Sequence, residues 1–225
     1  MFGSTLEVFL SGAPRAALIT GPWLWCRTAG FPPGALWLAR LALAVLLTAV
    51  VIKLMDDALD EELDRARGYR NWAARLGRAT TPYALVLAFP AAALDLHVST
   101  ALFLGAYALG MGRDLRERLP SRLPAWVETG LVLATAIFIS GLCLTAAALS
   151  QLWAIQVADD WLDRVEDSRP GGASPASRGA QWQRLGWVFL GTLVAAALHP
   201  WVAVSAVLST LAVWSLGRKQ EVHEP

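Results

Sequence analysis

Long stretches without ionisable side chains constrain this chain more than any other feature. Asp, Glu, Lys and Arg are absent from residues 79–94, 96–112, 129–158 and 185–217. A membrane-spanning helix needs roughly 20 apolar residues in succession. The chain is 56% hydrophobic and 16% charged, whereas soluble domains average about 45–50% apolar and about 25% charged residues. The sequence therefore predicts an integral membrane protein.

The last two of these stretches are too long for one span, and each contains a natural break. Proline disfavours helix in the residue before it, so we expect the last stretch to break at His199-Pro200. We expect the preceding stretch to turn near Ser140-Gly141. Each of the two stretches then supplies two short spans.

Two further segments complete the predicted architecture. Residues 34–55 read as one span, and Leu6–Cys26 reads as a broken or partial span because it contains Pro14 and Pro22. The expected fold class is all-α: a polytopic transmembrane bundle of about eight helices, with seven to nine as the range. We expect one transmembrane domain over residues 1–225.

Basic residues predict the orientation of this bundle. They gather at residues 65–78, 113–122, 164–184 and 218–219, whereas the connections between these segments carry none. Because basic loops stay on the cytoplasmic side, we expect all four segments there. The predicted location is the cytoplasmic (inner) membrane of a bacterium, with the active-site loops facing the cytoplasm. A net charge of +1 leaves no basic surface for nucleic acid.

The chain contains an internal repeat that centres on two acidic runs. The halves cover about residues 34–112 and 137–217, and an even number of predicted spans between the runs places both on one face. Transporter folds built from such repeats often hold a shared site between the halves, and by analogy we expect a shared site between the halves here. A shift of 103 residues superposes Asp56, Asp57, Asp60, Asp64 and Gly68 on Asp159, Asp160, Asp163, Asp167 and Gly171.

The spacing within each run places the carboxylates on one helical face, because positions i, i+4 and i+8 align along a helix. Like charges at this spacing destabilise a helix by about 0.2–0.5 kcal/mol per pair, and helix C-termini disfavour anions. Either run alone is explained by solvated loop charges, but two runs in register require a bound cation. The predicted metal ligands are Asp56, Asp57, Asp60, Asp64, Asp159, Asp160, Asp163 and Asp167.

Carboxylate oxygens favour Mg²⁺, which proteins hold through one or two carboxylates together with phosphate oxygens. Zinc prefers Cys and His ligands, and neither residue type lies near the acidic runs in the sequence. Arginine matches phosphate oxygens with its guanidinium fork. Lys53 lies one turn before Asp57 and could pair with an aspartate or meet a phosphate. The predicted substrate-binding cations are Lys53, Arg65, Arg67, Arg70, Arg164 and Arg169.

These runs resemble the motifs of a known family. Asp56-Asp57-x-x-Asp60-x-x-x-Asp64 is similar to the NDxxDxxxD motif of the UbiA superfamily of intramembrane prenyltransferases, and Asp159-x-x-x-Asp163-x-x-x-Asp167 is similar to its DxxxDxxxD motif. The order of spans is also similar, so the resemblance covers most of a short, divergent chain. It implies a helical bundle around a central cavity, Mg²⁺ held by both motifs, and a prenyl diphosphate whose tail lies in an apolar tunnel open to lipid.

The activity implied is transfer of a prenyl group, an alkyl group, from its diphosphate to a lipophilic acceptor in the membrane. We expect Asp60 and Asp163 to be essential for diphosphate release. If the substrate's own double bond captures the cation, the protein is a terpene cyclase of the same superfamily. A CDP-alcohol phosphotransferase, a cation transporter and an inactive homologue are further alternatives. The prenyl chain length, the acceptor and the oligomeric state stay open.

Overall fold

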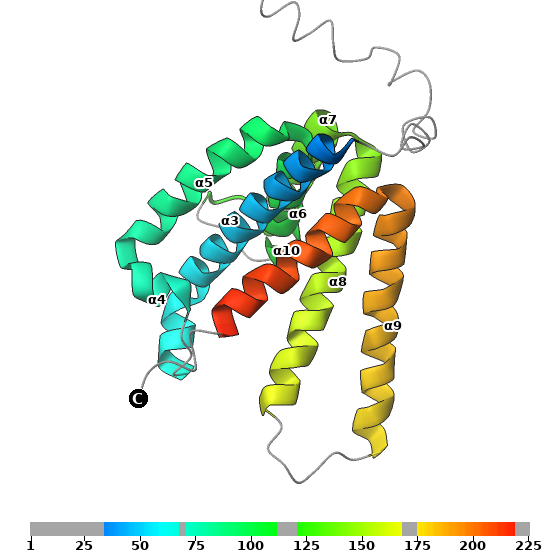
Figure 1. The fold of residues 1–225 in the computed structure, drawn as a ribbon. Coiled ribbons are helices and arrows are strands. Elements are labelled where there is room, and N and C mark those ends of the chain that lie inside the picture. The colour runs from blue at the N-terminus through cyan, green and yellow to red at the C-terminus, as the bar shows by residue number, and fades with distance from the viewer. Residues whose placement is uncertain (1–33, 68–70, 112–120, 168–174, 219–225) are drawn as a thin grey trace, which may run out of the picture. The chain divides into compact units, whose positions relative to one another are not determined.

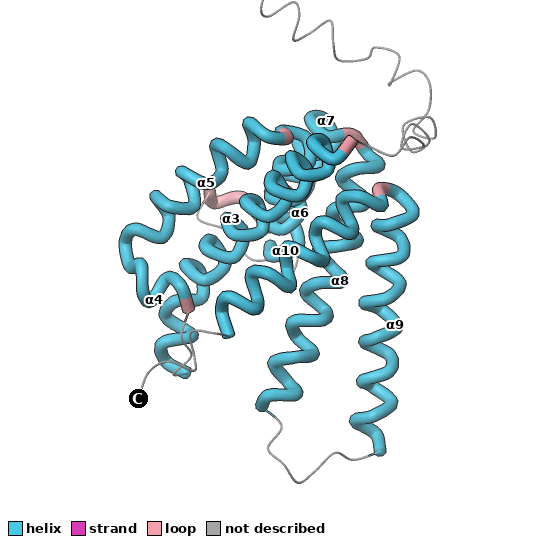
Figure 2. The backbone as a smooth tube through the Cα atoms, viewed as in Figure 1, coloured by secondary structure: helices cyan, strands magenta, loops and turns pink. Residues whose placement is uncertain are grey.

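The computed structural model describes residues 34–67, 71–111, 121–167 and 175–218 (Figure 1). They belong to one compact unit, which begins at Gly34. The described residues form helices joined by short connections, as Figure 2 shows. The predicted all-α class is therefore confirmed for this part of the chain. The predicted partial span Leu6–Cys26 lies outside the described residues.

Seven helices in the described part are at least 15 residues long, and one short helix and one 3-10 turn follow the first of them. Their bounds are α3 Ala35–Arg67, α4 Trp72–Leu76, η2 Gly77–Ala79, α5 Thr80–Leu94, α6 Leu96–Met111, α7 Ala125–Ser140, α8 Leu142–Asp167, α9 Pro175–Leu198 and α10 Pro200–Arg218.

Both predicted breaks in the long apolar stretches are confirmed. Gly141 separates α7 from α8 with φ 81°, a conformation that suits glycine, and its N–H donates to the Ile137 carbonyl at 2.8 Å. Pro200 is the first residue of α10. An N–H at this position has no partner within the helix, so proline, which lacks the N–H, is tolerated there. The chain therefore reverses direction at these two sites.

Two helical segments are long and apolar enough to cross a membrane, namely residues 35–62 of α3 and residues 142–160 of α8. Four shorter apolar helical segments accompany them in α6, α7, α9 and α10. Helix α3 is 33 residues long, so its C-terminal part extends past the apolar segment. Asp56, Asp57 and Asp60 of the first acidic run lie in the last residues of that segment, and Asp64 lies just past it.

Apolar side chains from α3, α6, α8 and α10 form one buried core. At the contact between α6 and α8, a Cβ on Gly105 would lie 3.1 Å from Leu152 Cδ1, so small residues let the helices approach closely. The remaining long helices lie outside this core, with α5 against α3, α7 against α6 and α9 against α8. The buried core residues are Leu41, Val45, Val98, Ala101, Leu102, Ala148, Val202 and Ala206.

The turns opposite the acidic runs are tied to one another. Ser140 Oγ donates to the His97 carbonyl at 2.7 Å, and His97 Nδ1 lies 2.7 Å from the Ile139 carbonyl. These bonds join the start of α6 to the end of α7. The Asp95 charge acts on His199, which links the turn before α6 to the turn before α10. Three turns therefore meet at one end of the unit.

Candidate functional site

The first acidic run occupies the C-terminal part of α3, where the three described aspartates have different surroundings. Asp56 and Asp60 are exposed, whereas Asp57 is only 3% exposed. The backbone of Asp64 is helical, but its side chain lies outside the described residues. The predicted stripe of equivalent carboxylates therefore contains one aspartate that points into the protein.

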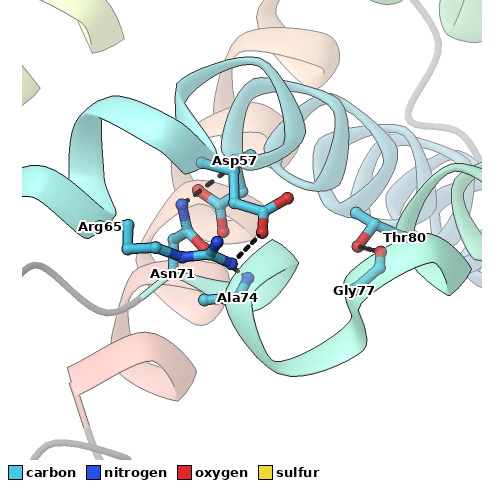
Figure 3. A network of polar contacts seen from close by, with 7 residues as sticks. Asp57, Arg65, Asn71, Ala74, Gly77 and Thr80 are labelled. Carbon is cyan, nitrogen blue, oxygen red and sulfur yellow. Dashed lines mark hydrogen bonds and ion pairs between the residues drawn. The ribbon is translucent and has the colours of Figure 1, made fainter.

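Both carboxylate oxygens of Asp57 have partners. Lys53 Nζ lies 2.8 Å from Asp57 Oδ1, and the Trp72 N–H donates to Asp57 Oδ2 at 2.8 Å. The Asn71 side-chain amide also donates to the Asp57 carbonyl at 3.2 Å. Figure 3 shows Asp57 and Asn71 together where α3 meets α4. Asp57 therefore holds the segment that follows the first acidic run.

Asn71 has a role that sequence reasoning missed. It is buried and caps α4, because its Oδ1 accepts from the Ala74 N–H at 2.7 Å. An Asn directly before a short run of helix-forming residues is a recognisable start signal. No local sequence pattern predicts the hydrogen bond from Asn71 to the Asp57 carbonyl, because the two residues are 14 positions apart.

The second acidic run occupies the C-terminal part of α8. Asp159 and Asp160 are exposed. The side chains of Asp163, Asp167 and Arg164 lie outside the described residues, although the backbone of all three belongs to α8.

The Lys53 ammonium connects the two runs electrostatically. It interacts with the charges of Asp57 and Asp56 on its own helix and with the charge of Asp159 on α8. The carboxyl-terminal ends of α3 and α8 therefore lie at the same end of the unit, as Figure 1 also shows. This is the end opposite the three joined turns. The structure thus places Lys53 in contact with Asp57 and within electrostatic reach of Asp56 and Asp159.

Of the predicted substrate-binding cations, only Lys53 and Arg65 have described side chains, and each forms an ion pair on its own helix. Lys53 is 45% exposed and pairs with Asp57, one of the two partners that the sequence left open. Arg65 is 69% exposed and pairs with Glu61 at 2.6 Å, a surface contact of little energetic weight. Arg70 and Arg169 lie outside the described residues, as do the side chains of Arg67 and Arg164.

The donor atoms suit Mg²⁺ in chemical type, since exposed aspartates from both runs supply hard oxygen ligands. Among the described side chains, however, no three Asp, Glu, His or Cys residues form a group that could hold a metal ion. Asp57 already uses both carboxylate oxygens in contacts with protein groups. The exposed candidates whose side chains are described are Asp56, Asp60, Asp159 and Asp160.

A groove of about 690 Å³ runs along α8, with walls from α6, α7 and α9. Most of its surface is apolar, including Leu133, Leu149, Leu190 and Val194. The resemblance implied a cavity at the centre of the bundle. This groove lies at the side of α8, apart from the core that α3, α6, α8 and α10 share, and the central cavity stays a prediction.

Two contacts between α8 and α9 shape this groove. Trp153 and Trp187 meet edge to face, with ring centroids 5.6 Å apart and planes at 80°. A Cβ on Gly191 would lie 2.9 Å from the Ser150 carbonyl oxygen. Glycine is therefore needed at position 191 for α9 to lie this close to α8.

A further polar network lies where α6 ends and α7 begins. Glu128 accepts hydrogen bonds from the Tyr107 hydroxyl at 2.8 Å and from the Ser121 hydroxyl at 2.6 Å. This network fixes the start of α7, the helix that supplies one wall of the groove. The sequence carries no signal for it, because Tyr107 and Glu128 belong to different helices.

Comparison with models of protein families, with curated proteins and with solved structures finds no match to this chain.

Proposed function

We propose that this chain is a Mg²⁺-dependent intramembrane prenyltransferase, which ionises a prenyl diphosphate and transfers the prenyl group to a lipophilic acceptor. One observation carries the proposal. Lys53 pairs with Asp57 at 2.8 Å and lies within electrostatic reach of Asp159, and the two aspartates belong to acidic runs 103 residues apart in register. A diphosphate bound through metal ions requires carboxylates from separate helices at one end of a bundle.

The proposed setting is the cytoplasmic membrane of a bacterium, with the acidic ends facing the cytoplasm. The two long apolar segments and the four shorter ones support a polytopic arrangement. The packing also supports two related halves, because α3 contacts α5, α6 and α10, and α8 contacts α9, α10 and α6. These partner sets are equivalent when α3, α5 and α6 are matched with α8, α9 and α10.

We assign the metal-holding role to the exposed aspartates of both runs, Asp56, Asp60, Asp159 and Asp160, together with Asp64, Asp163 and Asp167. Bound Mg²⁺ would supply positive charge against the charge that develops on the departing diphosphate. Lys53 adds a fixed cation at the same end, and the arginines after each run would bind diphosphate oxygens. Asp57 acts as a positioning residue, since it holds both Lys53 and the start of α4.

The test is diphosphate release by purified protein with Mg²⁺ and prenyl diphosphates of several lengths. We expect Asp60→Asn and Asp163→Asn each to reduce release at least a hundredfold, and chelation of Mg²⁺ to abolish it. Asp95→Asn is the matched control. Asp95 lies at the opposite end and accepts from the Val98 N–H at 3.0 Å, a role that Asn also fills.

Unchanged release in both Asp60→Asn and Asp163→Asn would remove the site assignment. The mass of the product separates the two enzymatic alternatives. A hydrocarbon alone indicates a cyclase, whereas a prenyl increment on another molecule indicates a transferase. Ion uptake into proteoliposomes without any prenyl substrate would instead identify a transporter.

A further inference from the structure

We propose that the groove along α8 is the binding site of the acceptor, and that this acceptor is an uncharged lipid alcohol. The inference rests on the proposed function, because it takes the bundle to be membrane-embedded and the reaction to be a transfer. It adds the chemical class of the acceptor and the part of the fold that binds it.

The size and lining of the groove suit a hydrocarbon chain. Its volume of about 690 Å³ lies within the 300–1,000 Å³ typical of small-molecule sites. Eight of the eleven described residues that line it are apolar, and one of these eight, Trp153, forms an aromatic wall. In a bilayer, such a surface is covered by a lipid chain rather than by water.

One atom in the groove shows that a hydrocarbon alone is an incomplete occupant. Thr129 lines the groove, and its Oγ1 is shielded from solvent and finds no hydrogen-bond partner among the described residues. A buried hydroxyl without a partner is costly, so rotation of the Thr129 side chain toward a ligand oxygen in the groove would gain a hydrogen bond. The groove is also lined by Ser150 and Gln156. The occupant therefore carries a group that donates or accepts hydrogen bonds.

The described lining suits a neutral head group. None of its eleven residues is acidic or basic, so these residues offer a diphosphate no counter-charge. Thr, Ser and Gln side chains hydrogen-bond to neutral oxygen atoms instead. The groove therefore differs in chemistry from the acidic ends of α3 and α8, where the prenyl diphosphate is proposed to bind.

The polar part of the groove leads toward the second acidic run. Gln156 lies four residues before Asp160 on α8, so the two share one helical face, one turn apart. In the transfer, the acceptor oxygen forms a bond to the prenyl carbon as the carbon–oxygen bond to diphosphate breaks. The diphosphate leaves with that electron pair and takes up the hydroxyl proton.

The test is photo-cross-linking of the purified full chain in lipid nanodiscs. The probes are a long-chain alcohol that carries a diazirine in its chain and an alkane of equal length with the same diazirine. We expect the alcohol to label α7, α8 and α9 around the groove, and plain alcohol to compete. Thr129→Val should reduce labelling by the alcohol about two- to tenfold, the loss of one hydrogen bond, without changing labelling by the alkane.

Thr135→Val is the matched control, because Thr135 lies on the same helix, is exposed and bonds to the Leu131 carbonyl. A second variant, Leu133→Trp, should fill the groove and reduce labelling by both probes. Its control is Leu131→Trp at an exposed site outside the groove. Equal labelling by the two probes, or equal effects of Thr129→Val and Thr135→Val, would overturn the inference.

The outcomes for the groove and for the proposed function are distinguishable. Labelling needs neither Mg²⁺ nor a prenyl diphosphate, so Asp60→Asn should leave it unchanged. Selective labelling without diphosphate release would support the alcohol site and reject the transferase. Diphosphate release without selective labelling would reject the groove as the acceptor site. A prenyl increment on the bound alcohol, when Mg²⁺ and prenyl diphosphate are added, would support both.

Discussion

Asp57 shows how one residue in a chemically uniform run acquires a different role. Its neighbours Asp56 and Asp60 are exposed, whereas Asp57 is buried between Lys53 and the start of α4. Helix geometry alone accounts for this, because successive residues point about 100° apart around the axis. A carboxylate that faces inward needs partners, and here a lysine and a backbone N–H supply them.

We expect Asp57→Asn to destabilise the protein by about 1–3 kcal/mol, because the substitution removes the ion pair with Lys53 at a buried position. The measurement is the midpoint of thermal unfolding in detergent. Glu61→Gln breaks the exposed pair with Arg65 and should cost less than about 1 kcal/mol. Equal shifts in the two variants would contradict a structural role for Asp57.

His199 makes the stability of the fold depend on pH. Burial lowers the pKa of His199 from its ordinary value of 6.5, and its Nδ1 finds no hydrogen-bond partner among the described residues. The unfolded chain therefore binds a proton more readily than the folded chain does. The contribution of His199 to stability is present above pH 6.5 and is lost as the pH falls through the lowered pKa of the folded state.

We therefore expect the unfolding midpoint of the parent protein to fall as the pH is lowered from 7 toward 5. His199→Gln should show a smaller fall over this range, since glutamine does not titrate. Thermal unfolding at matched ionic strength measures both. An identical pH dependence in parent and variant would show that His199 is not the responsible group.

At the scale of elements, glycine positions decide how closely α8 and α9 pack. Gly191 and Gly186 lie on the same helix, but only Gly191 faces another helix at close range. We expect Gly191→Ala to destabilise the protein by about 1–3 kcal/mol, because its Cβ would lie 2.9 Å from the Ser150 carbonyl oxygen and force the helices apart.

Gly186→Ala is the internal control for this prediction. No heavy atom lies within 4 Å of its added Cβ, and alanine favours helix over glycine by about 0.8–1.0 kcal/mol. We therefore expect Gly186→Ala to raise the unfolding midpoint and Gly191→Ala to lower it. Shifts of the same sign would show that contact between α8 and α9 does not depend on Gly191.

At the scale of the whole molecule, the proposed topology places both acidic ends on one side of the membrane. Single cysteines at Glu62 and Asp160, in a chain whose native cysteines are replaced, should react with an impermeant maleimide from the same side. A cysteine at Leu96, the first residue of α6, should react only from the other side. Labelling of positions 62 and 160 from opposite sides would reject the topology and the shared site.

Helix positions and chain reversals follow from local sequence. Runs of apolar residues predicted the helices, and Gly141 and Pro200 ended or began them as expected, because backbone preferences act within a few residues. The repeat likewise predicted two acidic helix ends on one face. Lys53 and Asp159 support this through their electrostatic interaction.

Contacts between helices could not be read in the same way. The core shared by four helices, the partners of Asp57 and the groove beside α8 all depend on which helical faces meet. Apolar patterning is weak in a chain whose helices are apolar on most sides, so several packings are compatible with one sequence. Close contact at small residues such as Gly105 and Gly191 selects among them, and that selection places Thr129 and Gln156 in one groove.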